Sequence, residues 1–574
     1  MSDKYIEYRQ ARQPLPSKNR LWPLYGAGFE NLGVDDKPIE TDMPSFGPDE
    51  LLVRHDACGL CFSDIKILSL GDKHPRIFKD MKKDPVVMGH EVVMTVVGVG
   101  DTLKDQYKVG QRFIIQADIY ADGVGYAYGY MIQGGLSQYG VIDQRILNGD
   151  DGNYLIPIKE ETGYVESALV EPWACVIAAY QLKYRTGIKP GGVAWIIGGA
   201  NADPDRPYTI SAGFDEQSHP AILLLTNVPE PLAGWLKQKA KALGVETHDA
   251  PDPDHLPGAI DKIDDIIVLG SDADLIEKVS PRLADFGVVA IVSDKPFARK
   301  ASIDVGRIHY NRWVYVGTKS PDIARAYADT PVRSTLKPGG LCWMVGAGGP
   351  IGRMHLQRAI ELPNGPSVIV CTDVSDVRLE DLRRSFEQDA KDHLISLVCL
   401  NPTKKEDAAQ LAEYKACGGF DDIIVLAPVA AVIADAATYL NRKAVMNVFA
   451  GVNRGTMVPL DLTDTLDKDA RVIGHSASSI EDMLTMLRDT EEGRLSPNRS
   501  VAAVGSLDAA KVGLQALKDA TYPGKVVIFP NIKELPVTAL PDLKDKLPTV
   551  YAKLKNGREW TVEAEEEFLR LMAN

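Results

Sequence analysis

Three short segments in the first third of the chain carry side chains that could bind a metal ion. They are Cys61-Phe62-Ser63-Asp64, Gly89-His90-Glu91 and Val170-Glu171-Pro172-Trp173. Cysteine, histidine and carboxylate are ligands that zinc accepts, and a catalytic zinc needs three protein ligands and one open position. Each segment by itself also has an ordinary structural explanation. Cys58 and Cys61 form a C-x-x-C pair, but no second pair follows, which argues against a zinc ribbon.

A glycine-rich turn later in the chain could bind a dinucleotide. The apolar run Leu341–Val345 is too short for a buried helix, and helical spacing resumes at Arg353. The pattern therefore predicts a strand, a tight turn and a helix, in which backbone N–H groups face the pyrophosphate. The residues predicted to form this site are Gly346, Gly348, Gly349, Pro350, Ile351 and Gly352.

An acidic residue follows this turn at the spacing expected for a ribose-binding carboxylate. The next apolar run, 368–372, ends in Asp373, which lies 21 residues after Gly352 (352 to 373). A carboxylate there accepts hydrogen bonds from the adenosine ribose and repels a 2′-phosphate. The spacing favours NAD over NADP. The alternative is a glycine turn with an unrelated surface aspartate.

Length and composition limit the number of domains, the partners and the location of the protein. At 574 residues, the chain is expected to hold three or four domains. A net charge of −15 argues against nucleic acid or an anionic membrane as a partner. The start of the chain resembles neither a signal peptide nor a clear transit peptide, and no apolar run is long enough to span a membrane. The seven scattered cysteines suggest reduced thiols. We therefore expect a soluble cytoplasmic protein.

Residues 1 to about 190 are predicted to be rich in β-strands, and their motifs resemble a known family. The matching segments are GLCFSD (59–64), GHE (89–91), KVGQRF (108–113), GGLSQYGV (134–141) and VEPWA (170–174). They are similar to the catalytic domain of the zinc-dependent medium-chain dehydrogenase/reductase superfamily, the alcohol and polyol dehydrogenases. The resemblance resumes at the glycine turn and at TDVSDVRL (372–379), and it covers most of the chain.

The resemblance implies a role for each matching residue. Cys61, His90 and Glu171 are implied as zinc ligands, with Glu91 as an inner or outer carboxylate. Ser63 would touch the substrate oxygen and start a proton relay, and Asp64 would orient His90 through its other ring nitrogen. Asp373 and Arg378 would hold the adenosine ribose. The lobe between Gly110 and Gly135 contains no cysteine, so one catalytic zinc per chain and no structural zinc are expected.

The nucleotide-binding part of the sequence is duplicated. Lys189-Pro190-Gly191-Gly192 recurs as Lys337-Pro338-Gly339-Gly340, and Asp264-Asp265-Ile266-Ile267 recurs as Asp421-Asp422-Ile423-Ile424. Two successive copies of an α/β nucleotide fold are therefore predicted. The first copy has no later glycine to open a helix and carries Asn227 where the second carries Asp373. We expect this copy to be degenerate and kept for packing, oligomer contacts or access to the active site; a second nucleotide or effector site is the alternative.

These observations predict an α/β architecture with a GroES-like β-rich catalytic domain and two tandem doubly wound Rossmann domains, the first degenerate. The predicted domains are 1–190 (zinc catalytic domain), 191–335 (degenerate Rossmann-like domain), 336–495 (NAD-binding Rossmann domain) and 496–574 (return to the catalytic domain and a C-terminal tail). The tail's charge run, Glu563–Glu567, is expected on a solvated helix packed on the body. A homodimer or homotetramer is expected from the family resemblance alone.

The function implied by the resemblance is hydride transfer between NAD and a secondary alcohol of a polyol or sugar. Segments 350–360 and 553–569 look most like the L-sorbose-1-phosphate reductase branch, which makes a phosphorylated sugar the second candidate. Arg54, Lys66, Lys73 and Arg353 are candidates to bind such a phosphate. Two other classes stay open: a zinc-free reductase of activated double bonds, and a non-catalytic NAD-sensing or scaffold protein.

Overall fold

The chain forms two compact units in the computed structural model, which describes residues 4–257, 260–328 and 333–574. Unit 1 comprises Met1–Ala178, Gly349–Met354 and Ala477–Asn574, and unit 2 comprises Ala179–Gly348 and His355–Ser476. Unit 1 thus resumes at Ala477, earlier in the sequence than the predicted return at 496. None of the helices in the described residues is both long and apolar enough to cross a membrane.

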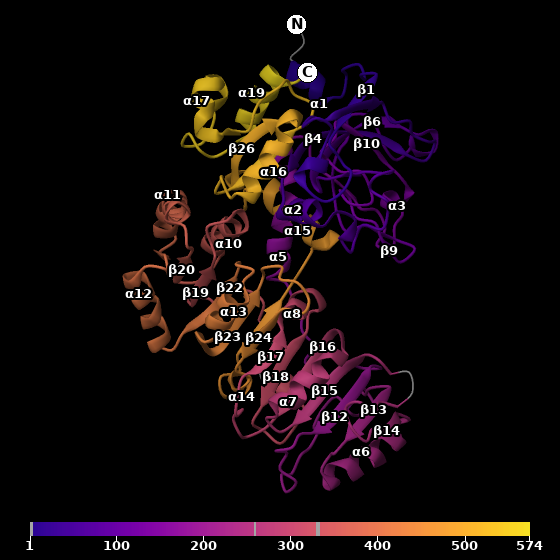
Figure 1. Ribbon diagram of the computed structural model, residues 1–574, viewed down its shortest axis with the longest axis vertical. Coiled ribbons are helices and arrows are strands. Elements are labelled where there is room, and N and C mark those ends of the chain that lie inside the picture. The colour runs from indigo at the N-terminus through magenta and orange to yellow at the C-terminus, as the bar shows by residue number, and fades with distance from the viewer. Residues whose placement is uncertain (1–3, 258–259, 329–332) are drawn as a thin grey trace. The chain divides into compact units, whose positions relative to one another are not determined.

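Unit 1 is built on an eight-stranded sheet that joins both ends of the chain (Figure 1). Its central strand, β4 (Leu51–Gly59), is buried along its whole length and pairs antiparallel with β6 (Glu91–Val99) on one side. On the other side it pairs with β27 (Lys525–Phe529). The C-terminal segment therefore completes the sheet that carries the N-terminal motifs. The remaining strands are β7 (Arg112–Ile115), β10 (Tyr139–Ile142), β11 (Leu155–Pro157), β26 (Val501–Ser506) and β28 (Thr538–Ala539).

Helices carry the other chemical motifs of unit 1. Helix α2 (Phe62–Leu70) follows β4 directly, and α4 (Tyr164–Ala168) leads into α5 (Val170–Ala178). The other principal helices of unit 1 are α1 (Lys4–Arg9), α15 (Ile480–Glu491), α16 (Ala510–Lys518) and α19 (Val562–Met572).

Unit 2 contains two six-stranded parallel sheets of identical topology (Figure 1). The first has the order β14-β13-β12-β15-β16-β18 and the second the order β21-β20-β19-β22-β23-β25. This is the doubly wound order of a dinucleotide-binding fold. The predicted α/β class with two Rossmann-like folds is confirmed.

The first sheet consists of β12 (Val193–Gly198), β13 (Ile222–Thr226), β14 (Glu246–Asp249), β15 (Ile263–Leu269), β16 (Leu283–Val292) and β18 (Val314–Thr318). The second consists of β19 (Leu341–Val345), β20 (Val368–Thr372), β21 (Ser396–Leu400), β22 (Phe420–Val425), β23 (Leu440–Val448) and β25 (Arg471–Gly474). The principal helices are α6 (Glu230–Leu243), α7 (Ala273–Val279) and α8 (Val305–Asn311) in the first fold, and α10 (Pro350–Glu361), α11 (Asp376–Asp392), α12 (Lys405–Ala416), α13 (Ala430–Ala437) and α14 (Thr463–Asp467) in the second.

The duplication extends to side-chain contacts. Arg185 forms an ion pair with Asp265 of β15 at 2.8 Å, and Arg333 forms the equivalent ion pair with Asp422 of β22 in the second fold. In each fold a buried tryptophan of the first strand donates to a threonine of the second, Trp195 to Thr226 at 2.9 Å and Trp343 to Thr372 at 3.0 Å. The repeat found in the sequence therefore places equivalent contacts in both folds.

Candidate active site

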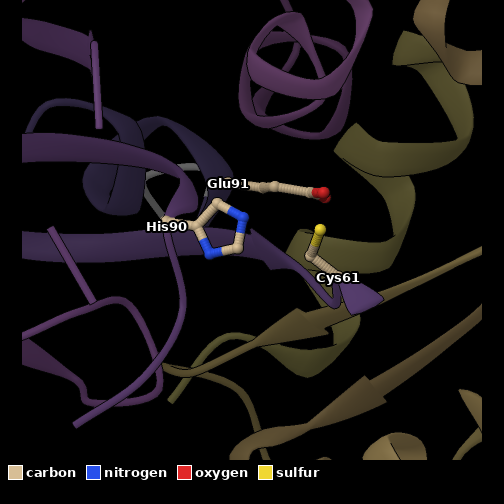
Figure 2. A group of neighbouring side chains, drawn as sticks. All are labelled: Cys61, His90 and Glu91. Carbon is tan, nitrogen blue, oxygen red and sulfur yellow. The ribbon is translucent and has the colours of Figure 1, made fainter. Parts of the chain in front are cut away.

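Three predicted ligands lie together in unit 1. One ligand atom each from Cys61, His90 and Glu91 lies within 4.8 Å of the others. Among the described residues, these three form the group of His, Cys, Asp or Glu side chains that are close enough together to bind a metal ion. Figure 2 shows the three side chains pointing toward one another. Cys61 is the residue that precedes α2, His90 precedes β6, and Glu91 is the first residue of β6.

The local backbone brings these residues together through one carboxylate. Asp64 is fully buried and accepts a hydrogen bond from the Cys61 N–H at 2.9 Å through Oδ2. Its Oδ1 accepts from the Gly89 N–H at 3.4 Å and lies 3.5 Å from His90 Nδ1. Asp64 thus links the start of α2 to the turn before β6, which agrees with the predicted orienting role.

Glycines on both sides make room for the cluster. A Cβ at Gly89, whose φ is +100°, would lie 2.7 Å from Cys58 Sγ. A Cβ at Gly59 would lie 2.2 Å from Glu91 Oε2. Side chains at either position would therefore collide with the residues that hold Glu91 and His90 in place.

Glu91 is paired with a lysine from the other end of the chain. Lys525, the first residue of β27, forms a buried ion pair with Glu91 Oε1 and donates to the Leu60 carbonyl at 3.2 Å. Both side chains are at most 4% exposed. Sequence reasoning missed Lys525, because a lysine at the start of an apolar run is ordinarily an exposed strand end.

The donor set fits a metal cation. His90 Nδ1 and Glu91 Oε2 are buried and have no hydrogen-bond partner. Burial by itself would lower the pKa of His90, but Cys61 and Asp64 outweigh it and raise that pKa well above its ordinary value. The same negative charges that hold a proton on His90 would hold a cation. Sulfur, imidazole nitrogen and carboxylate oxygen are a combination that zinc binds.

Glu171 lies on α5 and is outside the group of three, but the charges of that group reach it. Burial raises the pKa of Glu171 to about 7, His90 opposes this, and Glu91 adds to it. Ser63 lies in the first turn of α2, two residues after Cys61, and is partly exposed. The structure thus places Ser63 and Glu171 near the cluster, and their roles stay predictions.

The glycine turn of the second nucleotide fold has the predicted form. Gly346 has φ of +79°, and α10 begins at Pro350, so that Ile351 and Gly352 lie in its first turn. Asp373 follows β20, is 8% exposed, and accepts the Gly348 N–H at 3.0 Å. A Cβ at Gly348 would lie 2.7 Å from both Asp373 Oδ2 and Arg378 Cβ, whereas one at Gly349 would meet nothing within 4 Å. The turn, Asp373 and Arg378 are therefore in contact, and open space adjoins Gly349.

The equivalent turn of the first fold is filled by its own side chains. After β12 the chain forms no helix before α6. The Ala200 N–H donates to Asp272 at 3.1 Å, and Asn201 donates to the Ser271 carbonyl at 2.9 Å. One backbone N–H of this turn is thus bonded to an acid, and the Asn201 side chain is bonded to the loop before α7. These contacts favour the predicted degeneracy of this copy, which stays a prediction.

Comparison with known proteins agrees with this geometry. Residues 47–148 match the model of the alcohol dehydrogenase GroES-like domain. The chain is 28% identical over 313 residues to mannitol-1-phosphate 5-dehydrogenase of Aliivibrio fischeri (50% of this chain, 72% of the relative). It is 27% identical over 319 residues to L-sorbose 1-phosphate reductase of Klebsiella pneumoniae (50% and 73%).

Residues 47–148 therefore carry an alcohol dehydrogenase GroES-like domain. The comparisons support an oxidoreductase of the alcohol and polyol dehydrogenase type. The crystal structure of 2R,3R-butanediol dehydrogenase from Bacillus subtilis shares the fold, with a TM-score of 0.50 at 16% identity over 89% of this chain and 100% of that one.

Cationic side chains lie beside the cluster of Cys61, His90 and Glu91. The ring of Tyr130 lies 6.1 Å from that of His90 and 5.4 Å from that of His74, and the Arg76 guanidinium lies 5.1 Å from it. Burial lowers the pKa of His74, and the charges of Arg76 and Lys66 lower it further. Of the predicted phosphate-binding candidates, Lys66 belongs to this group, whereas Arg54 is buried and paired with Asp56 at 2.7 Å.

Proposed function

We propose that this dehydrogenase transfers a hydride between NAD and a secondary alcohol of a polyol or sugar, with one zinc ion per chain. The observation that carries the proposal is the convergence of Cys61, His90 and Glu91, with one ligand atom of each within 4.8 Å of the others, in a GroES-like domain. Cys61, His90 and Glu171 are the residues that would hold the metal, with Glu91 as an inner or outer carboxylate. Zinc bound there supplies Lewis acidity, and NAD supplies the hydride acceptor.

The chain's own residues would orient the reactants and move the proton. Asp64 holds Cys61 and the His90 turn in place through its two oxygens. The Ser63 hydroxyl, in the first turn of α2, would accept the alcohol proton and pass it outward. Lys525 neutralises Glu91 and so sets the net charge of the cluster. Asp373 would accept hydrogen bonds from the adenosine ribose.

The proposal is tested by NADH formation with purified, zinc-loaded protein and a panel of polyols, sugars and sugar phosphates, with NADP run in parallel. We expect turnover with NAD and a polyol. Glu171→Ala should lose both zinc, measured by elemental analysis, and turnover. Glu161→Ala is the matched control, because Glu161 is an exposed carboxylate on the loop before α4. Full activity of Glu171→Ala would contradict the proposed ligand set.

A phosphorylated sugar is the second candidate substrate, and Tyr130 with its surrounding cations favours it. Arg76 and Lys66 lie in unit 1 with the proposed metal ligands. A guanidinium binds phosphate in bidentate fashion, and Arg76 would do so beside its ion pair with Asp118 at 2.5 Å. The names of the relatives from A. fischeri and K. pneumoniae support the same substrate class. Arg76→Ala should lower kcat/KM for a sugar phosphate about ten-fold or more and leave the unphosphorylated polyol within about two-fold. Equal losses on both substrates would argue against phosphate recognition.

A further inference from the structure

The two nucleotide folds of unit 2 contact each other through equivalent strands. Strand β17 (Ala301–Asp304) of the first fold pairs antiparallel with β24 (Met457–Leu460) of the second. The second copy follows the first by 157 residues, as Asp264 and Asp421 show, so Ala301 is equivalent to Val458 and Ile303 to Leu460. The pair Ala301–Leu460 therefore becomes Val458–Ile303, which is also a pair in the structure. The strand pairing has the symmetry of a two-fold axis.

The edge strands of the two sheets repeat this symmetry through a pair of glycines. A Cβ at Gly317 on β18 would lie 2.6 Å from Thr465 Oγ1 and 2.9 Å from Leu466 Cδ2, both in α14 of the other fold. A Cβ at Gly474 on β25 would lie 2.7 Å from His309 Cα in α8 and 2.8 Å from the Ile308 carbonyl. The same 157-residue shift relates Gly317 to Gly474 and residues 308 and 309 to 465 and 466. Each fold thus presents a glycine to the equivalent helix of the other.

The contact between the folds is apolar and closed to solvent. One hydrophobic cluster contains buried side chains from both folds. Those closest to the paired strands are at most 3% exposed: Ile303, Val305, Ile308, Val458, Leu460 and Leu462. A face that is buried, apolar and the same on both partners is the signature of an isologous dimer interface.

We propose that the first nucleotide fold is an internal partner subunit: it occupies, within the chain, the face by which the second fold would otherwise pair with a second copy of this chain. An isologous patch is self-complementary, so either a tandem copy or another chain can cover it. The tandem copy keeps this patch while its glycine turn no longer opens a helix. Packing against the cofactor-binding fold accounts for the retention of a whole domain, and this face is closed to association between chains.

The first test is a cysteine pair at Ser302 and Pro459, which lie opposite each other on the paired strands and are not buried. Pro459 has no N–H and cannot complete a hydrogen-bonded pair, so the Cα spacing should be about 4.5 Å, which a disulfide can span. The background is Cys417→Ser, since Cys417 is an exposed free thiol. We expect the oxidised double variant to lose two thiols while keeping the mass of one chain in non-reducing, denaturing electrophoresis.

The matched controls are the single variants Ser302→Cys and Pro459→Cys, oxidised as a mixture. We expect no covalent dimer, because the partner position lies in the same chain. A disulfide between two chains, in the mixture or in the double variant, would overturn the proposal. Failure of the double variant to form any disulfide would also overturn it, because the two strands would then not be paired.

The second test asks whether the two glycines belong to one interface. Gly317→Val and Gly474→Val should each lower the unfolding midpoint by several degrees, and the double variant should lose clearly less than the two losses combined, since both changes disrupt one contact. Gly187→Ala is the control, because a Cβ there meets nothing within 4 Å and φ is not positive. Strictly additive losses, or no loss from Gly317→Val, would show that the folds do not support each other.

Discussion

Lys525 affects the charge of the cluster of Cys61, His90 and Glu91 through its buried ion pair with Glu91. Glu91 is fully buried. Its carboxylate pairs with Lys525 and also lies within 4.8 Å of the ligand atoms of Cys61 and His90. The charge of Lys525 offsets one of the negative charges gathered there. Burying a carboxylate without such a partner costs several kcal/mol. The ion pair therefore offsets the cost of burying the Glu91 carboxylate.

Replacing Lys525 by methionine should lower the free energy of unfolding by about 3–5 kcal/mol, because Glu91 loses its buried partner. Urea denaturation of the metal-free protein measures this loss without interference from zinc. Lys525→Arg is the control, since it retains the charge and should recover most of the loss. An unchanged unfolding free energy in Lys525→Met would mean that the ion pair with Glu91 does not stabilise the folded protein.

Asp373 is the residue on which cofactor choice should depend. Its Oδ2 accepts the Gly348 N–H at 3.0 Å and its Oδ1 accepts the Ser375 N–H at 2.9 Å, so the carboxylate is held at the glycine turn. Asp373→Ser should lower kcat/KM with NAD about ten-fold or more and raise the NADP-to-NAD ratio, because a charged acceptor and the repulsion of a 2′-phosphate are both lost.

The matched control for Asp373 is Asn227→Ser, the equivalent position of the first fold. It should leave both kcat/KM values unchanged. A loss of NAD activity in Asn227→Ser as large as that in Asp373→Ser would mean that the first fold takes part in cofactor binding. An unaltered NADP-to-NAD ratio in Asp373→Ser would mean that this carboxylate does not determine cofactor choice.

At the scale of elements, the C-terminal helix α19 differs from the expectation for its charge run. Glu565 is 2% exposed, and its carboxylate accepts the N–H groups of Tyr164 and Val165 at the start of α4, at 2.5 and 2.8 Å. A helix packed on the body was expected, but Glu565 is not one of its solvated charges, because it shares the buried face of α19 with Phe568 and Leu569. The spacing of these three residues in the sequence was a signal that could have shown it. The tail thereby caps the helix that leads into α5 and Glu171.

The buried Glu565 should make stability depend on pH. Burial raises the pKa of Glu565 from 4.5 to about 7, although the two N–H groups oppose the shift. Between these values the folded state holds a proton that the unfolded state releases, so stability falls as the pH rises through this window. The full difference corresponds to about 3 kcal/mol.

Glu565→Gln removes this titration. Relative to the wild type, the variant should gain stability on going from about pH 5 to about pH 8, by up to about 3 kcal/mol in urea denaturation. Glu566→Gln is the control, because Glu566 is adjacent in α19 but is not buried. A constant difference between Glu565→Gln and the wild type at both pH values would contradict the raised pKa.

At the scale of the whole molecule, the sequence predicted what is carried by local repeats and short motifs. The two Lys-Pro-Gly-Gly segments and the two Asp-Asp pairs identified the duplicated fold, because each is tied to its neighbours by equivalent contacts such as Arg185–Asp265 and Arg333–Asp422. Contacts between distant segments could not be predicted. Lys525 is 434 residues from Glu91, and the pairing of β17 with β24 depends on how two separately predicted folds pack.

Two nucleotide folds in one chain should still bind one NAD. The second fold offers the Gly348 N–H, the start of α10 and Asp373, whereas the first places Asp272 against its turn and forms no helix there. A diphosphate in the first fold would therefore meet a carboxylate and lose the helix N-terminus that binds anions. Calorimetric titration with NADH should give one site per chain. Gly348→Val should abolish it, because its side chain would collide with Asp373 and Arg378, and the fold should persist. A second equivalent of bound NADH, or binding that survives in Gly348→Val, would make the first fold a working nucleotide site and reverse the assignment of the two copies.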